Sequence, residues 1–552
     1  MVFNVADLFE HAVDIAPDRT AIVCGNRRVT FAELDARSNQ LAHHLADRGI
    51  GHGDHVGVYA SNSLELAESM IALYKLRAVS VNVNFRYTEG ELEYVLDNAD
   101  VVGLVHQRGL SARVAAVLPR LPKLRHVVVV EDGTEDDGKA ARYGAVEFEA
   151  ALAQGSPERD FPERSPDDLY LLYTGGTTGR PKGVVWRHED VWRALGGGID
   201  FVSGEPLPDE WTQARTGNEM PLVRMCAAPL MHGQAQWAMF GALFGANTVV
   251  LMPRFDAHEV WRQVDAEKVN VMAIVGDAMA RPMIEAYREG GYDGSSLVAL
   301  SSTAALLSPG VKAAYLETFP NVFLTDAIGS SETGFMGIGV VSADAVETRG
   351  PKVTGSRSTI IIDDDGRRIE GPGRIGRLAR GGHVPVGYYK DPEKTARLFA
   401  EVDGQRFTVP GDLAVYEEDG SITLLGRGDQ CINTGGEKVF PEEVEGILKT
   451  HPGVFDALVI GLPDDRLGQR VGALLQWREG AERDAADLER FARGHLAGYK
   501  LPRSLWYVEQ IERTVAGKPD YTAARAHAGA HPPTVESAVT AGSFRSPTAD
   551  AR

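Results

Sequence analysis

The sequence predicts an α/β protein with a large N-terminal domain of helix-covered, mostly parallel sheets, a β-rich subdomain within it, and a small α+β domain towards the C-terminus. Three observations lead to this prediction. Strand-like and helix-like stretches alternate over about the first 325 residues, short glycine-rich strands follow from Gly366 to Gly426, and helical periodicity returns after Asp429. Alternating strands and helices imply a parallel sheet covered by helices. With 552 residues, the chain is long enough for several domain-sized units.

The N-terminal elements have clear start and stop signals. Asn4 can cap a first helix that Pro17 ends, and Thr30 with Glu33 forms a capping box that opens a second helix. Strands are then expected at residues 55–60, 79–83 and 101–106, with helices at 64–77 and 88–98. After residue 224 the expected strands are 224–229, 248–252, 271–275, 297–301 and 321–326.

The C-terminal part begins at a short polar joint near residues 427–429, between two different compositions. We therefore expect an N-terminal domain over residues 1–428 and a smaller domain over 429–526. Residues from about His527 to Arg552 are rich in Ala, His, Pro, Ser and Thr, which bury too little apolar surface to order a chain, so we expect a disordered tail. Expected elements of the small domain are helices at 441–450 and 485–496 and strands at 454–461, 471–476 and 505–510.

Composition excludes several classes of protein. The 57 Lys and Arg against 77 Asp and Glu give a net charge of −20, which disfavours nucleic acid and anionic membranes as partners. The only cysteines, Cys24, Cys226 and Cys431, form no CxxC pair, so neither a disulfide framework nor a zinc site is expected. Asp7 and Glu10 interrupt any signal-peptide core, and no apolar run reaches the length of a membrane span. We expect a cytoplasmic protein with no membrane span.

The stretch from Leu171 to Trp186, LLYTGGTTGRPKGVVW, has the composition of a phosphate-binding loop between two strands. Glycines let the backbone N–H groups approach a phosphate closely, threonines add hydroxyl donors and a lysine adds positive charge. A Walker A loop is excluded because Pro181 precedes the lysine and Gly183 follows it. The alternative is a glycine-rich hairpin without a ligand. The candidate ligands of the phosphate are Thr174, Gly175, Gly176, Thr177, Thr178, Gly179 and Lys182.

Five motifs occur in one order along the chain: YTGGTTGRPKGV, then IGSSETG from Ile328, VPGDL from Val409, GRGDQCINTGGEKVFPEEVE from Gly426 and ERTVAGKPDY from Glu512. In this order the sequence resembles the adenylate-forming superfamily of acyl-CoA synthetases, peptide-synthetase adenylation domains and luciferases, over about residues 4–523. WRHED, PLMHGQ and GKPDY are most similar to CoA ligases that act on fatty or sterol side-chain acids.

The resemblance implies a two-step reaction. ATP and a carboxylic acid give an acyl adenylate and pyrophosphate with Mg²⁺, and the thiol of CoA then displaces AMP. It implies that Lys182, Glu332 and Lys518 are catalytic, with Glu332 as the metal ligand. Mg²⁺ prefers hard oxygen ligands and takes few of them from protein. Ser331 is expected to bind the α-phosphate, and Asp412 with Arg427 to bind the ribose.

The resemblance also implies that the small domain is mobile and rotates about a hinge at Asp429, which exchanges Lys518 for the segment that lines the CoA tunnel. In that segment Gly435, Gly436 and Lys438 are expected to contact CoA, because glycine leaves room for the narrow pantetheine arm. The pocket for the acid is expected at His232, Ala304, Ala305 and Gly329, with Trp237, Met239 and Phe240 as an acyl-binding wall. The sequence leaves open whether the protein forms a homodimer.

Each of these residues has a structural alternative. Glu332 could be a carboxylate at a helix N-terminus, Asp412 part of an Asx-turn, Lys518 a solvated surface lysine, and Gly435 with Gly436 an ordinary tight turn. His232 and the apolar residues after it could belong to the core. Two other functions also stay open. The first is an adenylating enzyme that passes the activated group to a carrier-protein thiol or an amine, or that activates a different oxyanion. The second is a noncatalytic nucleotide-binding protein.

Overall fold

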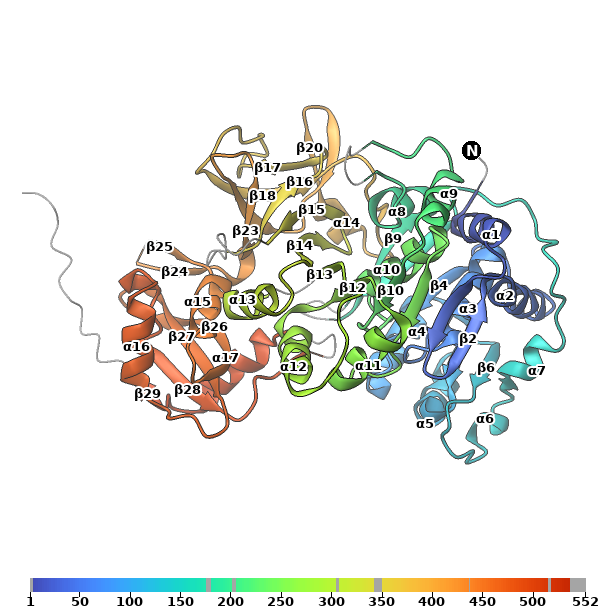
Figure 1. Cartoon of the computed structure of the whole chain (residues 1–552), viewed down its shortest axis with the longest axis horizontal. Helices are drawn as coiled ribbons and strands as arrows, with labels where there is room; N and C mark the ends of the chain where they lie inside the picture. Colours follow the sequence, from blue (N-terminus) through green and yellow to red (C-terminus); the bar gives the residue numbers. More distant parts are fainter. Residues whose placement is uncertain are drawn as a thin grey trace, which may run out of the picture. The chain divides into compact units, whose positions relative to one another are not determined.

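The chain forms two compact units, one built mainly from residues up to Leu424 and one mainly from residues after it (Figure 1). The computed structural model describes residues 3–174, 180–200, 205–303, 307–341, 350–435, 437–514 and 518–536, apart from the side chain of Asp429. Two sheets, of 15 and 8 strands, organise the first unit, and a 6-stranded sheet organises the second.

The 8-stranded sheet has the order β19-β9-β8-β4-β3-β5-β6-β7. Strands β8, β4, β3, β5, β6 and β7 run parallel to one another. Strand β9 pairs with β8, and β19 pairs with β9, both in antiparallel orientation. The bounds are β3 His55–Tyr59, β4 Val79–Asn82, β5 Val101–Gln107, β6 His126–Val130, β7 Val146–Glu147, β8 Leu169–Thr174, β9 Lys182–Arg187 and β19 Gly387–Tyr388.

The 15-stranded sheet begins with the order β2-β1-β11-β10-β12-β13-β14, which is parallel from β1 to β14. These strands are β1 Thr20–Cys24, β2 Arg27–Thr30, β10 Val223–Cys226, β11 Thr248–Leu251, β12 Val271–Ile274, β13 Ala299–Ser302 and β14 Phe323–Ser330. The sheet continues as antiparallel strands: β15 Gly334–Val340, β16 Lys352–Gly355, β17 Thr359–Ile362, β18 Ile375–Arg380, β20 Phe399–Val402, β21 Gln405–Thr408, β22 Asp412–Tyr416 and β23 Ile422–Arg427. The β-rich part, expected from residue 366, begins earlier, at β15.

Helices connect and cover the parallel strands of the first unit. Both predicted capping boxes are present, at Asn4 for α1 and at Thr30 for α2. The helices are α1 Val5–Ile15, α2 Phe31–Ala46, α3 Leu64–Lys75, α4 Glu89–Asn98, α5 Ser111–Val117, α6 Lys139–Arg142, α7 Phe148–Leu152, α8 His188–Leu195, α9 Thr212–Glu219, α10 Gly233–Phe244, α11 Ala257–Glu267, α12 Gly276–Glu289, α13 Pro309–Thr318 and α14 Pro392–Leu398.

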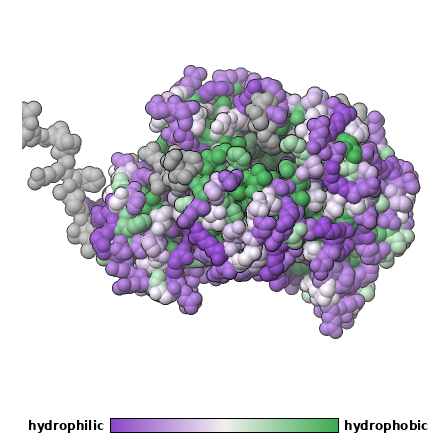
Figure 2. All heavy atoms as spheres, in the orientation of Figure 1, coloured by the Kyte–Doolittle hydropathy of each residue, from purple (hydrophilic) through white to green (hydrophobic). Residues whose placement is uncertain are grey.

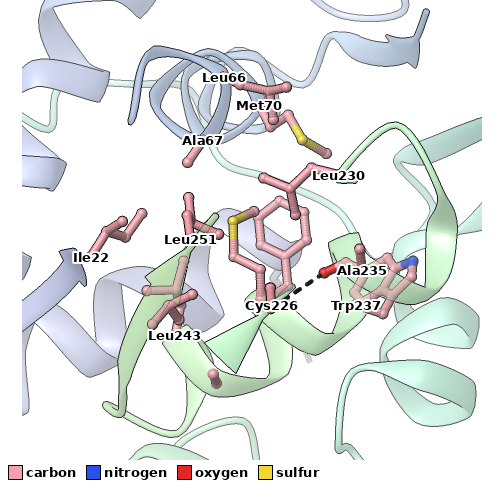
Figure 3. Packing of buried hydrophobic residues seen from close by; sticks show 14 of the residues in the cluster. Ile22, Leu66, Ala67, Met70, Cys226, Leu230, Ala235, Trp237, Leu243 and Leu251 are labelled. Atoms are coloured by element: carbon pink, nitrogen blue, oxygen red, sulfur yellow. Dashed lines mark hydrogen bonds between the residues drawn. The ribbon is translucent and has the colours of Figure 1, made fainter. Parts of the chain in front are cut away.

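The main core lies around α3, whose residues are all buried. In Figure 3, Leu66, Ala67 and Met70 of this helix face Leu251 of β11 and Cys226 of β10. The same cluster of buried side chains also includes residues from the 8-stranded sheet, so the core joins the two sheets. A helix buried on every side must be apolar or have its charges paired. The charged residues of α3 are paired accordingly: Glu65 with Arg27, Glu68 with Arg37, and Lys75 with Glu10 and Asp35.

The second unit contains the sheet β25-β24-β27-β28-β29, with β26 paired to β27. Its strands are β24 Ile432–Thr434, β25 Glu437–Val439, β26 Val454–Asp464, β27 Gly468–Trp477, β28 Ser504–Val508 and β29 Val535–Glu536, and its helices are α15 Pro441–Leu448, α16 Ala485–Arg493 and α17 Tyr521–Ala530.

The expected disordered tail does not begin at His527, because α17 runs through Ala530 and β29 pairs with β28. Tyr521 and Ala524 of this helix belong to a cluster of buried side chains that includes Trp506, and the indole N–H of Trp506 donates to the carbonyl of His531 at 3.0 Å. Burial in this cluster, together with the bond to His531, therefore anchors a segment whose composition suggested disorder. Residues 537–552 of the expected tail lie outside the described residues.

The surface agrees with the charge of the sequence. Hydrophilic residues cover most of the face shown in Figure 2. Among the described helices, none combines the length and the apolar composition needed to span a bilayer.

Candidate functional site

The predicted phosphate loop connects an antiparallel hairpin in the first unit. Strand β8 ends at Thr174 and β9 begins at Lys182, and these two residues pair directly across the hairpin. The structure therefore closes the two ends of the loop on each other and sets Lys182 at its exit. Gly175, Gly176, Thr177, Thr178 and Gly179 lie outside the described residues.

Lys182 and Glu332 both contact one tyrosine, Tyr388. The ammonium of Lys182 is 5.4 Å from the ring centroid of Tyr388, and the hydroxyl of Tyr388 donates a hydrogen bond to Oε1 of Glu332 at 2.9 Å. The first contact is a cation–π arrangement and the second is a hydrogen bond to a charged acceptor. Tyr388 thus joins the residue at the exit of the phosphate loop to the predicted metal ligand.

Strand β19 brings Tyr388 into this position. Gly387 and Tyr388 pair with Val185 and Val184 of β9, and the backbone N–H of Tyr388 donates to the hydroxyl of Thr395 at 2.9 Å. Gly387 has a φ of +151°, and a Cβ at this position would lie 2.4 Å from Cγ2 of Thr395. A larger residue at position 387 would therefore push Thr395 and the strand apart.

Glu332 lies in the turn between β14 and β15, so the alternative of a helix N-terminus is wrong for this residue. The hydroxyls of Ser330 and Thr333 bond to each other at 3.1 Å, and Ser330 Oγ accepts from the N–H of Glu332 at 3.2 Å. The carbonyl of Ser331 accepts from the indole N–H of the buried Trp186 at 2.9 Å. The turn that holds Ser331 and Glu332 is therefore fixed internally and against β9.

Gly329 precedes this turn and allows it to close. A Cβ on Gly329 would lie 2.4 Å from the carbonyl oxygen of Gly334 on the facing strand, a distance that real Cβ atoms do not show. This contact gives Gly329 a role in the hairpin, whereas the role predicted for it in the acid pocket stays a prediction.

The loop that carries His232 is held by two buried asparagines. Asn82 donates to the carbonyls of Tyr173 at 2.9 Å and Met231 at 2.6 Å, and it accepts from the N–H of Tyr173 at 2.7 Å. Asn62 accepts from the N–H of Leu230 at 2.6 Å. Asn82 therefore connects the strand before the phosphate loop with the residue before His232.

His232 itself is the half-buried N-cap residue of α10. The residues expected to form an acyl-binding wall are less than 4 % exposed: Trp237 3%, Met239 0% and Phe240 1%. All three belong to the main core cluster, so the alternative of plain core describes them better. Ala304 and Ala305 lie outside the described residues.

Asp412 and Arg427 occupy the ends of strands. Asp412 is the first residue of β22, after Gly411 with a φ of +101°, and Arg427 is the last residue of β23. Both residues are half-buried. Asp412 belongs to the same 15-stranded sheet as the β14–β15 hairpin that carries Glu332.

The second unit contains the remaining predicted residues. Asp429 lies in a single helical turn, Gly428–Gln430, directly after β23. Gly435 has a φ of +60° and begins the turn between β24 and β25, as the tight-turn alternative predicts, and Lys438 is exposed on β25. Lys518 is exposed beside Thr514, whose N–H donates to the carbonyl of Lys518 at 2.8 Å. Gly436 lies outside the described residues.

Sequence reasoning missed Tyr388, Asn62 and Asn82. The segment GYYKDPEKT around Tyr388 gives one local signal, a glycine before two aromatic residues. The asparagines give none, because each bonds to backbone groups far away along the chain.

The histidine of the WRHED segment, residues 186–190 after the phosphate loop, has a structural role. Nδ1 of His188 accepts from the N–H of Val5 at 3.3 Å, and Nε2 lies 3.2 Å from the carbonyl of Leu169. Burial lowers the pKa of His188 to about 4, so it is a neutral core residue at pH 7.

Comparisons with known proteins identify the family of the chain. The family model "AMP-binding enzyme" matches residues 9–389, and the model "AMP-binding enzyme C-terminal domain" matches residues 443–518. The chain is 53% identical over 540 residues to a 3-oxocholest-4-en-26-oate–CoA ligase of Rhodococcus rhodochrous, covering 96% of this chain and 97% of the relative. It is 52% identical to a medium/long-chain-fatty-acid–CoA/3-oxocholest-4-en-26-oate–CoA ligase of Mycobacterium tuberculosis, over 96% of this chain and 97% of the relative.

Solved structures share the fold. The chain is similar to the anthranilate CoA ligase AuaEII in complex with anthranoyl-AMP, with a TM-score of 0.83 and 22% identity over 96% of this chain and 98% of the other. It is also similar to ATP-bound MatB from Rhodopseudomonas palustris, with a TM-score of 0.80 and 24% identity over 95% and 99% of the two chains. The predicted α/β fold, with a large N-terminal and a small C-terminal domain, is confirmed. The chain therefore belongs to the AMP-binding enzyme family.

Proposed function

We propose that this protein is an AMP-forming acyl-CoA ligase that activates large hydrophobic carboxylic acids. In the first step the carboxylate oxygen attacks the α-phosphorus of ATP, the bond from that phosphorus to the bridging oxygen breaks, and pyrophosphate leaves. In the second step the sulfur of CoA attacks the acyl carbonyl, the bond to the AMP oxygen breaks, and AMP leaves while the thiol loses its proton. The expected class of enzyme, an acid–thiol ligase, is confirmed by relatives at about half identity.

The observation that carries this proposal is the group formed by Lys182, Tyr388 and Glu332. Attack on a phosphorus needs positive charge and hydrogen-bond donors where the negative charge of the leaving group develops. Lys182, at the exit of a threonine- and glycine-rich loop, supplies such a charge, and Thr174 supplies a hydroxyl at the entrance. Ser331, beside Glu332, would bind the α-phosphate.

The residues present also fit Mg²⁺ brought by the nucleotide. Among the described residues, no three His, Cys, Asp or Glu side chains gather into a metal site. Glu332 presents its carboxylate to the hydroxyl of Tyr388, whose ring contacts the ammonium of Lys182. Nucleotide-bound Mg²⁺ keeps most of its ligands from phosphate and water and takes one or two carboxylates from protein. Glu332 would hold the ion, which would neutralise phosphate charge.

Two further groups complete the proposal for adenylation. Asp412 would accept the ribose hydroxyls with help from Arg427, and Lys518 would bind the carboxylate and the α-phosphate. Lys518 is exposed on a short loop, as a residue that must meet a ligand requires. Thioester formation would use a movement of the smaller domain. We propose that the two domains are residues 1–428 and 429–526. The smaller domain would rotate about Asp429 to present Gly435, Gly436 and Lys438 to CoA.

The substrate is proposed from the relatives. Their names specify 3-oxocholest-4-en-26-oate and medium- and long-chain fatty acids, which share a carboxylate at the end of a large apolar body. We propose the same chemical class here, with His232, Ala304, Ala305 and Gly329 at the pocket. A cytoplasmic location fits three unpaired cysteines, and the net charge of −20 fits a protein that does not bind nucleic acid. We also propose that the protein forms a homodimer.

The test is an assay of pyrophosphate release over a panel of acids, with and without CoA, followed by mass spectrometry of the product. We expect acid-dependent release with 3-oxo-sterol and long-chain acids, and an acyl-CoA product when CoA is present. AMP release that ignores CoA would point to another acceptor, and no acid-dependent exchange would contradict the proposal. Lys518→Ala should slow adenylation by a factor of ~100 or more, the equivalent of ~3 kcal/mol, while a supplied acyl adenylate still reacts with CoA.

A further inference from the structure

The loop that carries Lys518 is closed at its base by backbone bonds. The N–H of Thr514 donates to the carbonyl of Lys518 at 2.8 Å, Arg513 and Pro519 form a β-bridge, and the N–H of Asp520 donates to the carbonyl of Glu512 at 3.0 Å. Lys518 is exposed at the end of this closed ladder. The backbone of Lys518 is therefore tied to the base of the loop, and what holds this base also holds Lys518.

On the incoming side, the base is held by a buried carboxylate. Nη2 of Arg513 donates to Oδ2 of Asp456 at 2.6 Å, and Asp456 is only 7% exposed near the start of β26. Oδ1 of Asp456 accepts from the N–H of Ala457 at 2.9 Å and lies 3.2 Å from Nζ of Lys449. Burial raises the pKa of the Asp456 carboxyl, but the positive charges of Lys449 and Arg513 lower it more, so this pKa lies below its ordinary value.

On the outgoing side, the loop ends in a second anchor. Tyr521, 8% exposed, is the first residue of α17, and its hydroxyl donates to Oε1 of Glu445 at 3.1 Å. The same oxygen accepts from the N–H of Val459 at 2.8 Å. Glu445 and Lys449 belong to one face of the α15 segment, so α15 and β26 together hold both sides of the loop.

The two anchors differ in what their loss would do. Tyr521 and Glu445 are buried together. Removing Glu445 leaves the Tyr521 hydroxyl and the N–H of Val459 without their acceptor, and removing Tyr521 takes a donor from a buried carboxylate, so either change threatens the fold. Arg513 has a side chain that is 27% exposed, and Asp456 keeps Lys449 as a partner when Arg513 is removed. Loss of Arg513 therefore loosens the loop while the buried carboxylate stays compensated.

We propose that Arg513, held by Asp456, is a positioning residue for Lys518 and contributes specifically to the adenylation step. This inference rests on the proposed role of Lys518. A lysine side chain is long and flexible, so a fixed loop base reduces the volume that its ammonium samples. The ion pair acts on the rate at which the acid attacks ATP, and the thioester step, which does not use Lys518, is independent of it.

The test compares the two half-reactions in Arg513→Met, which keeps the aliphatic stem and removes the charge. We expect the kcat of acid-dependent ATP–pyrophosphate exchange to fall about 10- to 100-fold, the range that a displacement of about 1 Å produces, with the KM for ATP little changed. Thioester formation from a supplied acyl adenylate should stay within about twofold of wild type. Arg513→Lys should recover most of the exchange activity, because the single Nη2–Oδ2 contact of Arg513 can be replaced by a contact from the lysine ammonium to Asp456.

Arg493→Met is the matched control. Arg493 pairs with Glu489 at 2.6 Å on α16 of the same unit, whereas α15 and β26 hold the Lys518 loop, so its loss should change neither half-reaction. The double variant Lys518→Ala/Arg513→Met should be no slower in exchange than Lys518→Ala, because both changes act through one ammonium.

Equal loss of both half-reactions in Arg513→Met, or additive loss in the double variant, would overturn the positioning role. The same holds if Lys518→Ala abolishes exchange and Arg513→Met leaves it intact, in which case the proposed function stands. If Lys518→Ala itself leaves exchange intact, the proposed role of Lys518 and this inference are both wrong.

Discussion

Removing the hydroxyl of Tyr388 separates the two contacts that this residue makes. Tyr388→Phe keeps the ring 5.4 Å from the ammonium of Lys182 and deletes the 2.9 Å hydrogen bond to Glu332. A hydrogen bond to a charged group contributes about 1.5–3 kcal/mol, and the half-buried site favours the lower end of this range. At about 1.4 kcal/mol per factor of ten, kcat/KM for ATP should fall about tenfold. Loss of a partner that orients a metal ligand has effects of similar size.

Tyr388→Ala should cost a further factor of about two to five, because it also removes a cation–π contact of about 0.5–1 kcal/mol. The assay is acid-dependent ATP–pyrophosphate exchange at varied ATP and Mg²⁺. Tyr389→Phe is the control, because the neighbouring hydroxyl donates to Oδ2 of Asp100 at 2.8 Å, a contact outside the Lys182–Glu332 group. Equal activity of Tyr388→Phe and Tyr389→Phe would refute the reasoning. Equal activity of Tyr388→Phe and Tyr388→Ala would show that the cation–π contact contributes nothing to the rate.

Two further predictions concern stability. Asn82→Ala removes hydrogen bonds to the carbonyls of Tyr173 and Met231 and to the N–H of Tyr173. It should lower the free energy of unfolding, measured in urea, by about 2–4 kcal/mol. A loss below about 1 kcal/mol would show that these backbone groups find other partners. Burial lowers the pKa of His188 from 6.5 to about 4, so the unfolded chain binds its proton first as the pH falls. The stability that His188 contributes is therefore complete above pH 6.5 and is lost as the pH falls to about 4, and urea unfolding of His188→Gln should show a shallower decline over that interval. An unchanged slope would contradict the assignment of this proton uptake to His188.

Local signals allowed much of the fold to be predicted. The capping boxes at Asn4 and Thr30 are confirmed, because the groups that form each box are only three residues apart. The two strands expected on either side of the phosphate loop are confirmed for the same reason, as β8 and β9. Such features depend on neighbouring residues, so the sequence contains the information directly.

The supports of the candidate site could not be predicted in this way. Asn82 bonds to Tyr173 and Met231, which are 91 and 149 residues away, and Tyr388 meets Glu332 across 56 residues. An asparagine at the end of a strand is also a common turn signal, so its local sequence favours a different interpretation. These contacts exist only once strands from different parts of the chain are in register.

The parallel pairing of β1 with β11 has a consequence for synthesis of the protein on the ribosome. Val23 pairs with Val250, so the first strand waits for a neighbour made more than 200 residues later. At about 5–20 residues per second, this interval lasts on the order of 10–50 s, during which the edge of the β1–β2 hairpin is open to other chains. Nascent chains released before residue 251 should therefore be ready clients for chaperones and prone to aggregate, whereas chains released after it can complete this part of the sheet.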